Sequence, residues 1–184
     1  MEVSRFDIEG PLLLKPRVFP DERGYFFESF NEQTFKTAGI DFYFRQDNQS
    51  YSHKNVLRGL HFQHPPFEQG KLVRVVQGSV LDVAVDIRRG SPSFGKHVKV
   101  VLRAGEHQLF WIPPGFAHGF LSLEDHTMFL YKCTNTYDKD SESGILWNDP
   151  SLDIDWGFSE NPLVSPKDLE LPSFSALDTR FEMK

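Results

Sequence analysis

The sequence predicts an all-β protein, a double-sheet jelly roll or small barrel with a few short helices. Short segments alternate between apolar and polar residues with the period of two that is typical of strands. Turns rich in glycine and proline separate these segments at short intervals. The chain contains 18 phenylalanines among 184 residues, and aromatic residues are enriched in strands. Many short strands of this kind most often close as a jelly roll or barrel whose interior can hold a ligand.

The length of 184 residues predicts a single domain over 1–184, with enough chain to bury a core. No apolar stretch approaches the roughly 20 residues of a membrane-spanning helix, so we expect no membrane segment. The first residues lack the basic head and apolar stretch of a secretory signal. The one cysteine, Cys133, cannot form an internal disulfide. Both features favour a location in the cytoplasm.

A helix is predicted over 31–38, because Asn31 suits the position before a helix and Gly39 suits the position that ends one. The clearest strand runs over 80–87, where the odd-numbered positions are apolar and the others include Asp82 and Asp86. Periodicity and short apolar runs predict further strands over 57–64, 72–76, 98–102, 109–112 and 128–131. A second short helix is expected to open near 165–168.

Several common chemistries have no signature in this chain. The glycine-rich nucleotide loops, the zinc-protease motif and the nucleophile elbow of the hydrolases are all missing from the sequence. A net charge of −6 argues against general nucleic-acid binding, although a local basic pocket can still hold an anionic ligand.

Five polar residues lie in or beside apolar strands, and each has a structural as well as a functional interpretation. His61 is either a hydrogen-bonded structural histidine or a group that faces a cavity. His118 follows a rigid turn and could be a buried neutral histidine, and Tyr131 could be a core residue. Lys71 could be a solvated strand end, and Asp168 could serve only the start of a helix.

Six motifs occur in order along the chain: RGLHFQ at 58–63, GKLVRVVQG at 70–78, DIR at 86–88, IPPGFAHGF at 112–120, YKCT at 131–134 and GILWNDP at 144–150. Together they resemble the dTDP-4-dehydrorhamnose 3,5-epimerase family, and the resemblance extends from about Phe19 to Asp168. The resemblance implies a cupin-type double-stranded jelly roll that acts as a homodimer without metal or organic cofactor. It also implies a role in dTDP-L-rhamnose biosynthesis.

The implied substrate is a dTDP-linked 4-keto-6-deoxy sugar, dTDP-4-dehydro-6-deoxy-D-glucose, which the family epimerises at carbons 3 and 5. A related enzyme that inverts one carbon or moves the keto group remains the alternative. By resemblance, His61 is the general base, Asp168 orients it, Tyr131 is the general acid and Lys71 lies near the keto oxygen. The positions that match the family's substrate cleft are Phe19, Arg23, Phe26, Glu28, Gln46, Asn48, Arg58, His118, Tyr137, Glu142 and Lys167.

The chemistry of epimerisation asks for these residue types. A histidine, with a reference pKa of about 6.5, suits proton removal beside a ketone, and a carboxylate can fix its tautomer. A lysine suits the enolate oxygen, and a tyrosine, with a reference pKa of about 10, is still protonated at neutral pH. Arg23 and Arg58 suit a diphosphate, because a guanidinium binds phosphate oxygens in pairs.

Two other classes of protein fit the same fold. A metal-dependent cupin would use His61, His64, Glu68 and His118 as ligands. Such cupins generally carry a second histidine two residues after the first, where this chain has Gln63, so we expect no metal. A non-catalytic sugar-nucleotide-binding module would lack the base and the acid, but His61 and Tyr131 are both present.

Overall fold

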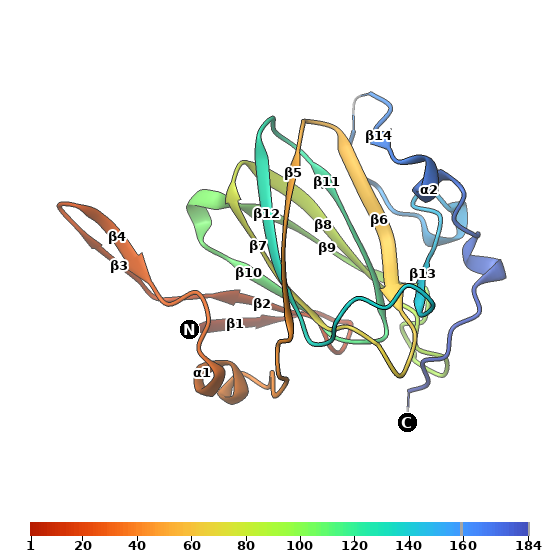
Figure 1. Cartoon of the computed structure of the whole chain (residues 1–184), viewed down its shortest axis with the longest axis horizontal. Helices are drawn as coiled ribbons and strands as arrows, with labels where there is room; N and C mark the ends of the chain where they lie inside the picture. The colour runs from red at the N-terminus through yellow and green to blue at the C-terminus, as the bar shows by residue number, and fades with distance from the viewer. Residues whose placement is uncertain (159, 184) are drawn as a thin grey trace.

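The computed structural model describes residues 1–158 and 160–183. The first sheet contains β1 (Glu2–Arg5), β2 (Leu12–Lys15), β10 (Leu109–Ile112), β7 (Lys71–Gln77), β12 (Thr127–Cys133) and β5 (Gln46–Ser52), in this order. The second contains β13 (Glu142–Gly144), β6 (Val56–Gln63), β11 (Phe116–Ser122), β8 (Ser79–Asp86) and β9 (His97–Arg103), and β14 (Leu163–Val164) pairs in parallel with β6. The prediction of a double-sheet, cupin-type jelly roll is confirmed (Figure 1).

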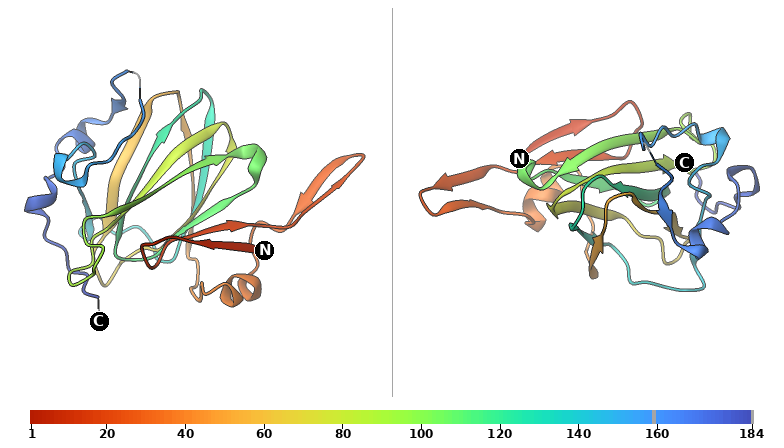
Figure 2. Two further views of the ribbon diagram at one scale, coloured as in Figure 1. Left: turned by 180° about the vertical axis from the view of Figure 1, so that it is seen from behind. Right: turned by 90° about the horizontal axis from the view of Figure 1, so that it is seen from above.

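The strands β3 (Val18–Asp21) and β4 (Gly24–Phe27) form a separate hairpin that projects away from both sheets (Figures 1 and 2). The helices are α1 (Glu32–Thr37) and α2 (Pro166–Leu169), and the 3₁₀ turns are η1 (Ala104–Glu106), η2 (Pro150–Leu152) and η3 (Phe174–Ala176). Both predicted helices are present, and Asn31 caps α1 by accepting a hydrogen bond from the Thr34 amide at 3.1 Å. No helix in the described part of the chain is long and apolar enough to cross a bilayer.

The strand β8 is buried on both faces. Its Val80 and Ala84 join the core between the two sheets, whereas Val83 and Val85 pack under the C-terminal segment that covers the second sheet. The predicted alternation along β8 is therefore correct, and the face of the strand that carries Asp82 points into the barrel. Asp82 lies on that inner face and is fully buried.

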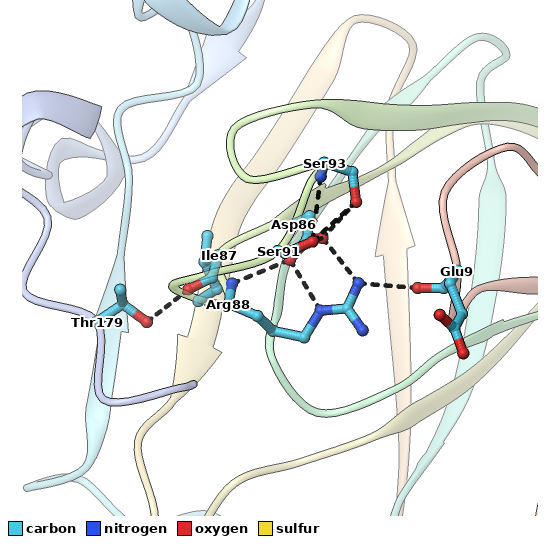
Figure 3. A network of polar contacts seen from close by, with 7 residues as sticks. All are labelled: Glu9, Asp86, Ile87, Arg88, Ser91, Ser93 and Thr179. Carbon is cyan, nitrogen blue, oxygen red and sulfur yellow. Dashed lines mark hydrogen bonds and ion pairs between the residues drawn. The ribbon is translucent and has the colours of Figure 1, made fainter. Parts of the chain in front are cut away.

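The carboxylate of Asp86, at the end of β8, is also fully buried and is the centre of a polar network (Figure 3). It accepts hydrogen bonds from Arg88 Nε at 2.9 Å, Ser91 Oγ at 2.6 Å and Ser93 Oγ at 2.7 Å. Arg88 Nη2 bridges Asp86 and the carbonyl of Glu9, at 2.7 and 2.8 Å. The network therefore ties the connection between β8 and β9 to the N-terminal segment.

The C-terminal tail returns to the same connection. Thr179 Oγ1 donates a hydrogen bond to the carbonyl of Ile87 at 2.7 Å, as Figure 3 shows. The amide of Arg89 also donates to the carbonyl of Phe181 at 2.9 Å. These bonds hold the end of the chain against the second sheet.

A bulge interrupts the pairing of β6 with β11. His61 lies opposite His118, and Arg58 lies opposite Phe120, so three steps along β6 match two steps along β11. Gly59 has a φ of +123°, and a Cβ at this position would lie 2.5 Å from the Cα of Gly119. Glycine is therefore required at position 59 by its backbone conformation and by the close approach of β11.

The bulge decides which side chains face the barrel interior. With a strict period of two, Arg58 and His61 would point to opposite faces of β6. Leu57 and Leu60 instead share the core under the C-terminal segment, and Arg58 and His61 both line the interior cleft.

Candidate active site

A cleft opens between the two sheets, where β5 of the first sheet faces β6 of the second. It holds a cavity of about 660 Å³, and an adjoining cavity of about 380 Å³ continues toward Tyr137 and Glu142. Three of the predicted catalytic residues, His61, Lys71 and Tyr131, line both cavities. They therefore mark the place where the two cavities meet.

His61 and Asp168 are in direct contact. His61 Nε2 lies 2.7 Å from Asp168 Oδ1, and Asp168 Oδ2 accepts a hydrogen bond from the Gly59 amide at 3.1 Å. The start of α2 is capped by Ser165, whose hydroxyl accepts from the Asp168 amide at 3.1 Å. The carboxylate of Asp168 is therefore free of the helix cap and bonds to β6.

The contacts of Asp168 determine its charge. Burial raises the pKa of this carboxyl, but its hydrogen bonds with His61 and Gly59 and the charge of His61 outweigh burial, so the pKa lies below the usual range. Asp168 is therefore ionised at neutral pH and accepts the Nε2 proton of His61. This leaves His61 Nδ1 as the ring nitrogen that can take up a proton.

Burial acts in opposite directions on Lys71 and Tyr131. It lowers the pKa of Lys71, because the protonated amine is the charged form. It raises the pKa of Tyr131, because the deprotonated phenol is the charged form. Lys71 Nζ lies 3.4 Å from the His61 carbonyl, to which it donates a hydrogen bond.

A second histidine and aspartate pair lies beside the first. His118 is paired with His61 across the two strands, and its Nε2 lies 3.0 and 3.1 Å from the two carboxylate oxygens of Asp82. Burial lowers the pKa of His118, although the charge of Asp82 opposes this. The sequence interpretation placed His118 in the cleft but did not include Asp82. An aspartate in the middle of a valine-rich strand was the signal that could have identified it.

The predicted binding residues of the body of the protein also lie in the cleft. Arg58, His118 and Lys167 line the larger cavity, and Gln46, Asn48, Tyr137 and Glu142 line the smaller one. Tyr137 Oη and Lys167 Nζ both donate to Glu142 Oε2, at 2.8 and 2.6 Å. The amide of Tyr137 donates to Gln46 Oε1 at 2.8 Å.

Comparison with known proteins agrees with this geometry. A family model described as dTDP-4-dehydrorhamnose 3,5-epimerase matches residues 5–176. The chain belongs to this epimerase family. The dTDP-4-dehydrorhamnose 3,5-epimerase of Salmonella typhimurium is 54% identical over 173 residues, which cover 94% of each chain.

Solved structures of the epimerase family share the fold. The dTDP-6-deoxy-D-glucose-3,5-epimerase of Legionella pneumophila, solved in complex with dTDP-4-keto-L-rhamnose, superposes with a TM-score of 0.93 at 46% identity. The match covers 96% of this chain and 94% of that chain. The epimerase of Elizabethkingia anophelis superposes with a TM-score of 0.91 at 43% identity, over 95% of this chain and 97% of that chain.

Four residues that the family resemblance assigns to the substrate cleft lie elsewhere in the single chain. Phe19, Arg23 and Phe26 belong to the projecting β3–β4 hairpin, and Glu28 follows it. None of the four lines either cavity of the cleft. Phe19 is 47% exposed and Phe26 is 68% exposed.

The metal-ligand set of a metal-dependent cupin does not form. No three or more His, Cys, Asp or Glu side chains converge on a possible metal position within residues 1–158 and 160–183. Gln63 Nε2 donates to the carbonyls of Phe67 and Thr136, at 2.6 and 3.2 Å. His64 packs against Phe62, with ring centroids 5.0 Å apart. Gln63 therefore supports the neighbouring loops.

Proposed function

We propose that the chain epimerises dTDP-4-dehydro-6-deoxy-D-glucose at carbons 3 and 5 to give dTDP-4-dehydro-L-rhamnose. One observation carries the proposal: in a chain of the epimerase family, His61 and its Asp168 partner share a cleft with Lys71 and Tyr131. These groups supply a base, a cation and an acid around one ligand position.

The keto group at carbon 4 acidifies the protons on carbons 3 and 5, so a base can remove them. His61 Nδ1 is the base, because Nε2 is held by Asp168 at 2.7 Å. When His61 takes the proton, the ionised Asp168 stabilises the resulting imidazolium. Gly59 holds the other carboxylate oxygen, so the pair keeps its geometry during the reaction.

Proton removal leaves an enolate whose charge collects on the oxygen of carbon 4. Lys71 stabilises that oxygen, because its amine reaches the cleft beside His61 from a buried position. A charge is more effective in such a site than in water, and the loss of one oxyanion donor typically slows a reaction by about a hundredfold or more.

Inversion requires a proton on the face opposite the base. His61 belongs to β6 of the second sheet, whereas Tyr131 belongs to β12 of the first sheet. A sugar bound between the sheets therefore has one residue on each side. Tyr131 is protonated at neutral pH, since burial raises its pKa, and donates its proton to the enolate carbon.

The proposal includes a homodimer in which each hairpin completes the partner's cleft. The β3–β4 hairpin projects away from the body of its own chain, as Figure 1 shows, and it carries the exposed side chains of Phe19 and Phe26. A symmetric pair of chains can exchange such elements so that both sites are completed in the same way. The proposed location is the cytoplasm, because the one cysteine, Cys133, is a buried free thiol.

The test is to incubate the protein with dTDP-4-dehydro-6-deoxy-D-glucose in deuterated water and to follow carbons 3 and 5 by NMR. Deuterium incorporation and inversion at both carbons would support the proposal. Inversion at a single carbon would assign the chain to a monoepimerase activity instead. No exchange at either carbon would overturn the proposal.

A further inference from the structure

The hydroxyl of Ser50 is a buried polar group in the cleft that the mechanism above does not use. Ser50 lies on β5, lines the larger cavity and faces Phe129 across the strand pair. Its Oγ is buried and has no hydrogen-bond partner among the described residues of the protein. A buried hydroxyl in this situation calls for a partner from outside the chain.

Other inward-facing polar side chains of β5 already have partners. Gln46 Nε2 donates to Asn48 Oδ1 at 2.9 Å, and Asn48 Nδ2 donates to Cys133 Sγ at 3.6 Å. Ser52 Oγ accepts from Arg58 Nε at 3.2 Å. Ser50 thus differs from its neighbours on the same face of the strand.

The strand register places Ser50 two residues along β5 from Asn48, which is the residue opposite Tyr131. Asn48 is opposite Tyr131, and Ser50 is opposite Phe129. The ring of Phe129 stacks on the ring of Phe120, with ring centroids 4.2 Å apart. Two residues along a strand span about 6.6 Å, so Ser50 lies roughly that far from the level of Tyr131.

Arg58 lines the same cavity as Ser50. It pairs with Phe120 on β11, and its Nε and Nη2 donate to Ser52 Oγ and the Tyr51 carbonyl at 3.2 and 3.1 Å. These two bonds hold the guanidinium against the two residues of β5 that follow Ser50. A guanidinium held beside a free hydroxyl is suited to binding phosphate oxygens.

The charges of the cavity favour an anion. Its basic residues are Arg58, Lys71 and Lys167, in addition to histidines. Among the described residues that line it, the acidic one is Asp168, whose carboxylate is already bonded to His61. A negatively charged group one step from the sugar is therefore favoured over a neutral one at this level.

We propose that Ser50 is a further substrate-binding residue, whose hydroxyl donates a hydrogen bond to the diphosphate of the sugar nucleotide beside Arg58. This inference rests on the proposed function, because the diphosphate is the charged group attached to the reacting sugar. Ser50 does not take part in proton transfer. Its loss should therefore raise KM and leave kcat nearly unchanged.

The experiment compares the wild-type protein with Ser50→Ala, and uses dTDP and thymidine as separate ligands in calorimetric or NMR titrations. We expect Ser50→Ala to weaken dTDP binding by about tenfold, as is typical when a hydrogen bond to a charged group is lost. Thymidine, which carries no phosphate, should bind equally well to both proteins. The exposed Ser175→Ala variant controls for the loss of a hydroxyl elsewhere, and thermal unfolding checks that each variant is folded.

Two results would overturn the inference. If dTDP binds both proteins equally while KM for the sugar nucleotide rises, the hydroxyl contacts the sugar. If neither dTDP binding nor KM changes, the hydroxyl has no ligand. The proposed function can fail independently of this inference. If the wild-type protein binds dTDP more tightly than Ser50→Ala does but converts no sugar nucleotide, the Ser50 site is supported and the epimerase activity is not.

Discussion

His61 Nε2 lies 2.7 Å from Asp168 Oδ1, although the two residues are 107 positions apart in the sequence. The contact joins the middle of β6 to the short helix α2 and leaves the cap of that helix to Ser165. The two interpretations of Asp168, helix cap and partner of His61, therefore make different predictions.

Asp168→Asn should reduce the rate by about a hundredfold or more, because an amide stabilises neither the required tautomer nor the imidazolium. The fold should persist, since an asparagine side-chain oxygen can still accept from Gly59. Rate and thermal unfolding are to be measured on the same samples. Ser165→Ala is the matched control, and should lose about 0.5–2 kcal/mol of stability with a much smaller fall in rate. If Asp168→Asn instead lowered the stability with little change in rate, Asp168 would be a structural residue.

Tyr131→Phe should separate proton exchange from inversion. The variant keeps the ring that contacts Phe129 and removes only the hydroxyl. His61 can still remove a proton and return one to the same face, so deuterium should enter the substrate with retained configuration. Inverted product should fall by roughly 10²–10⁴-fold, as expected for a lost general acid.

The readout for Tyr131→Phe is the ratio of inversion to exchange, followed by NMR in deuterated water. Tyr43→Phe, at a position that is 76% exposed, is the control and should leave this ratio unchanged. If Tyr131→Phe forms inverted product at the wild-type rate, Tyr131 is not the acid. Tyr137, which lines the adjoining cavity, would then be the next candidate.

The pH dependence of kcat/KM should report the charge of Lys71. Burial lowers the pKa of Lys71 below the ordinary 10.5, so the amine loses its charge at a lower pH than an exposed lysine does. The value of kcat/KM should therefore begin to fall at an alkaline pH that is lower than the pH at which an exposed lysine loses its charge. Burial raises the pKa of Tyr131, so the phenol remains protonated over this range.

Lys71→Arg tests this assignment, because a guanidinium keeps its charge at all of these pH values. Its absolute rate will be lower if the longer group fits poorly, but its alkaline limb should move to higher pH. An alkaline limb at the same pH in both proteins would assign the titration to another group. Lys139→Arg, on the connection after β12, is the control and should leave the limb in place.

Asp86→Asn should destabilise the protein by about 3–5 kcal/mol at neutral pH, because it breaks a buried ion pair and leaves Arg88 without its charged partner. Burial raises the pKa of Asp86, but the hydrogen bonds from Arg88, Ser91 and Ser93 outweigh burial and lower it overall. A lowered pKa contributes stability that is complete above the unfolded value of about 3.9 and is lost as the pH falls through the folded value.

Denaturant unfolding at a series of pH values checks this prediction. The difference between wild type and Asp86→Asn should be largest near neutral pH and should shrink as the pH falls below about 4. Asp178→Asn removes an exposed carboxylate that lies 3.5 Å from Arg89, and should change stability by no more than about 0.5 kcal/mol. A constant difference at all pH values would mean that the charge of Asp86 does not matter.

Mixing two inactive variants should restore activity if the hairpin completes the cleft of a second copy. His61→Asn lacks the base but keeps the hairpin, whereas Phe26→Ala combined with Arg23→Ala alters the hairpin but keeps the base. In a statistical mixture of equal amounts, about a quarter of the sites would combine an intact hairpin with an intact base. Activity that stays at the sum of the separate variants would show that each cleft uses only its own chain.

Local sequence determined the elements. The alternation of apolar residues is enough to predict β8, because apolar side chains at every second position lie on one face of a strand and can be buried together. Asn31 and Gly39 likewise mark the ends of α1, since helix caps depend on residues that are adjacent in the chain. The motifs that resemble the epimerase family then pointed to the residues of the site.

The tertiary structure alone decided how those residues meet. Period-two alternation would separate Arg58 from His61, whereas the register shift of the bulge places both in the cleft. The bulge requires glycine at position 59, because β11 approaches too closely for any side chain there. No local pattern links His61 to Asp168 or His118 to Asp82, because such pairs form only when distant strands and helices pack together. The lowered pKa values of Asp168 and His118 follow from the same packing, since burial and hydrogen bonds act on a side chain only after the barrel has closed around it.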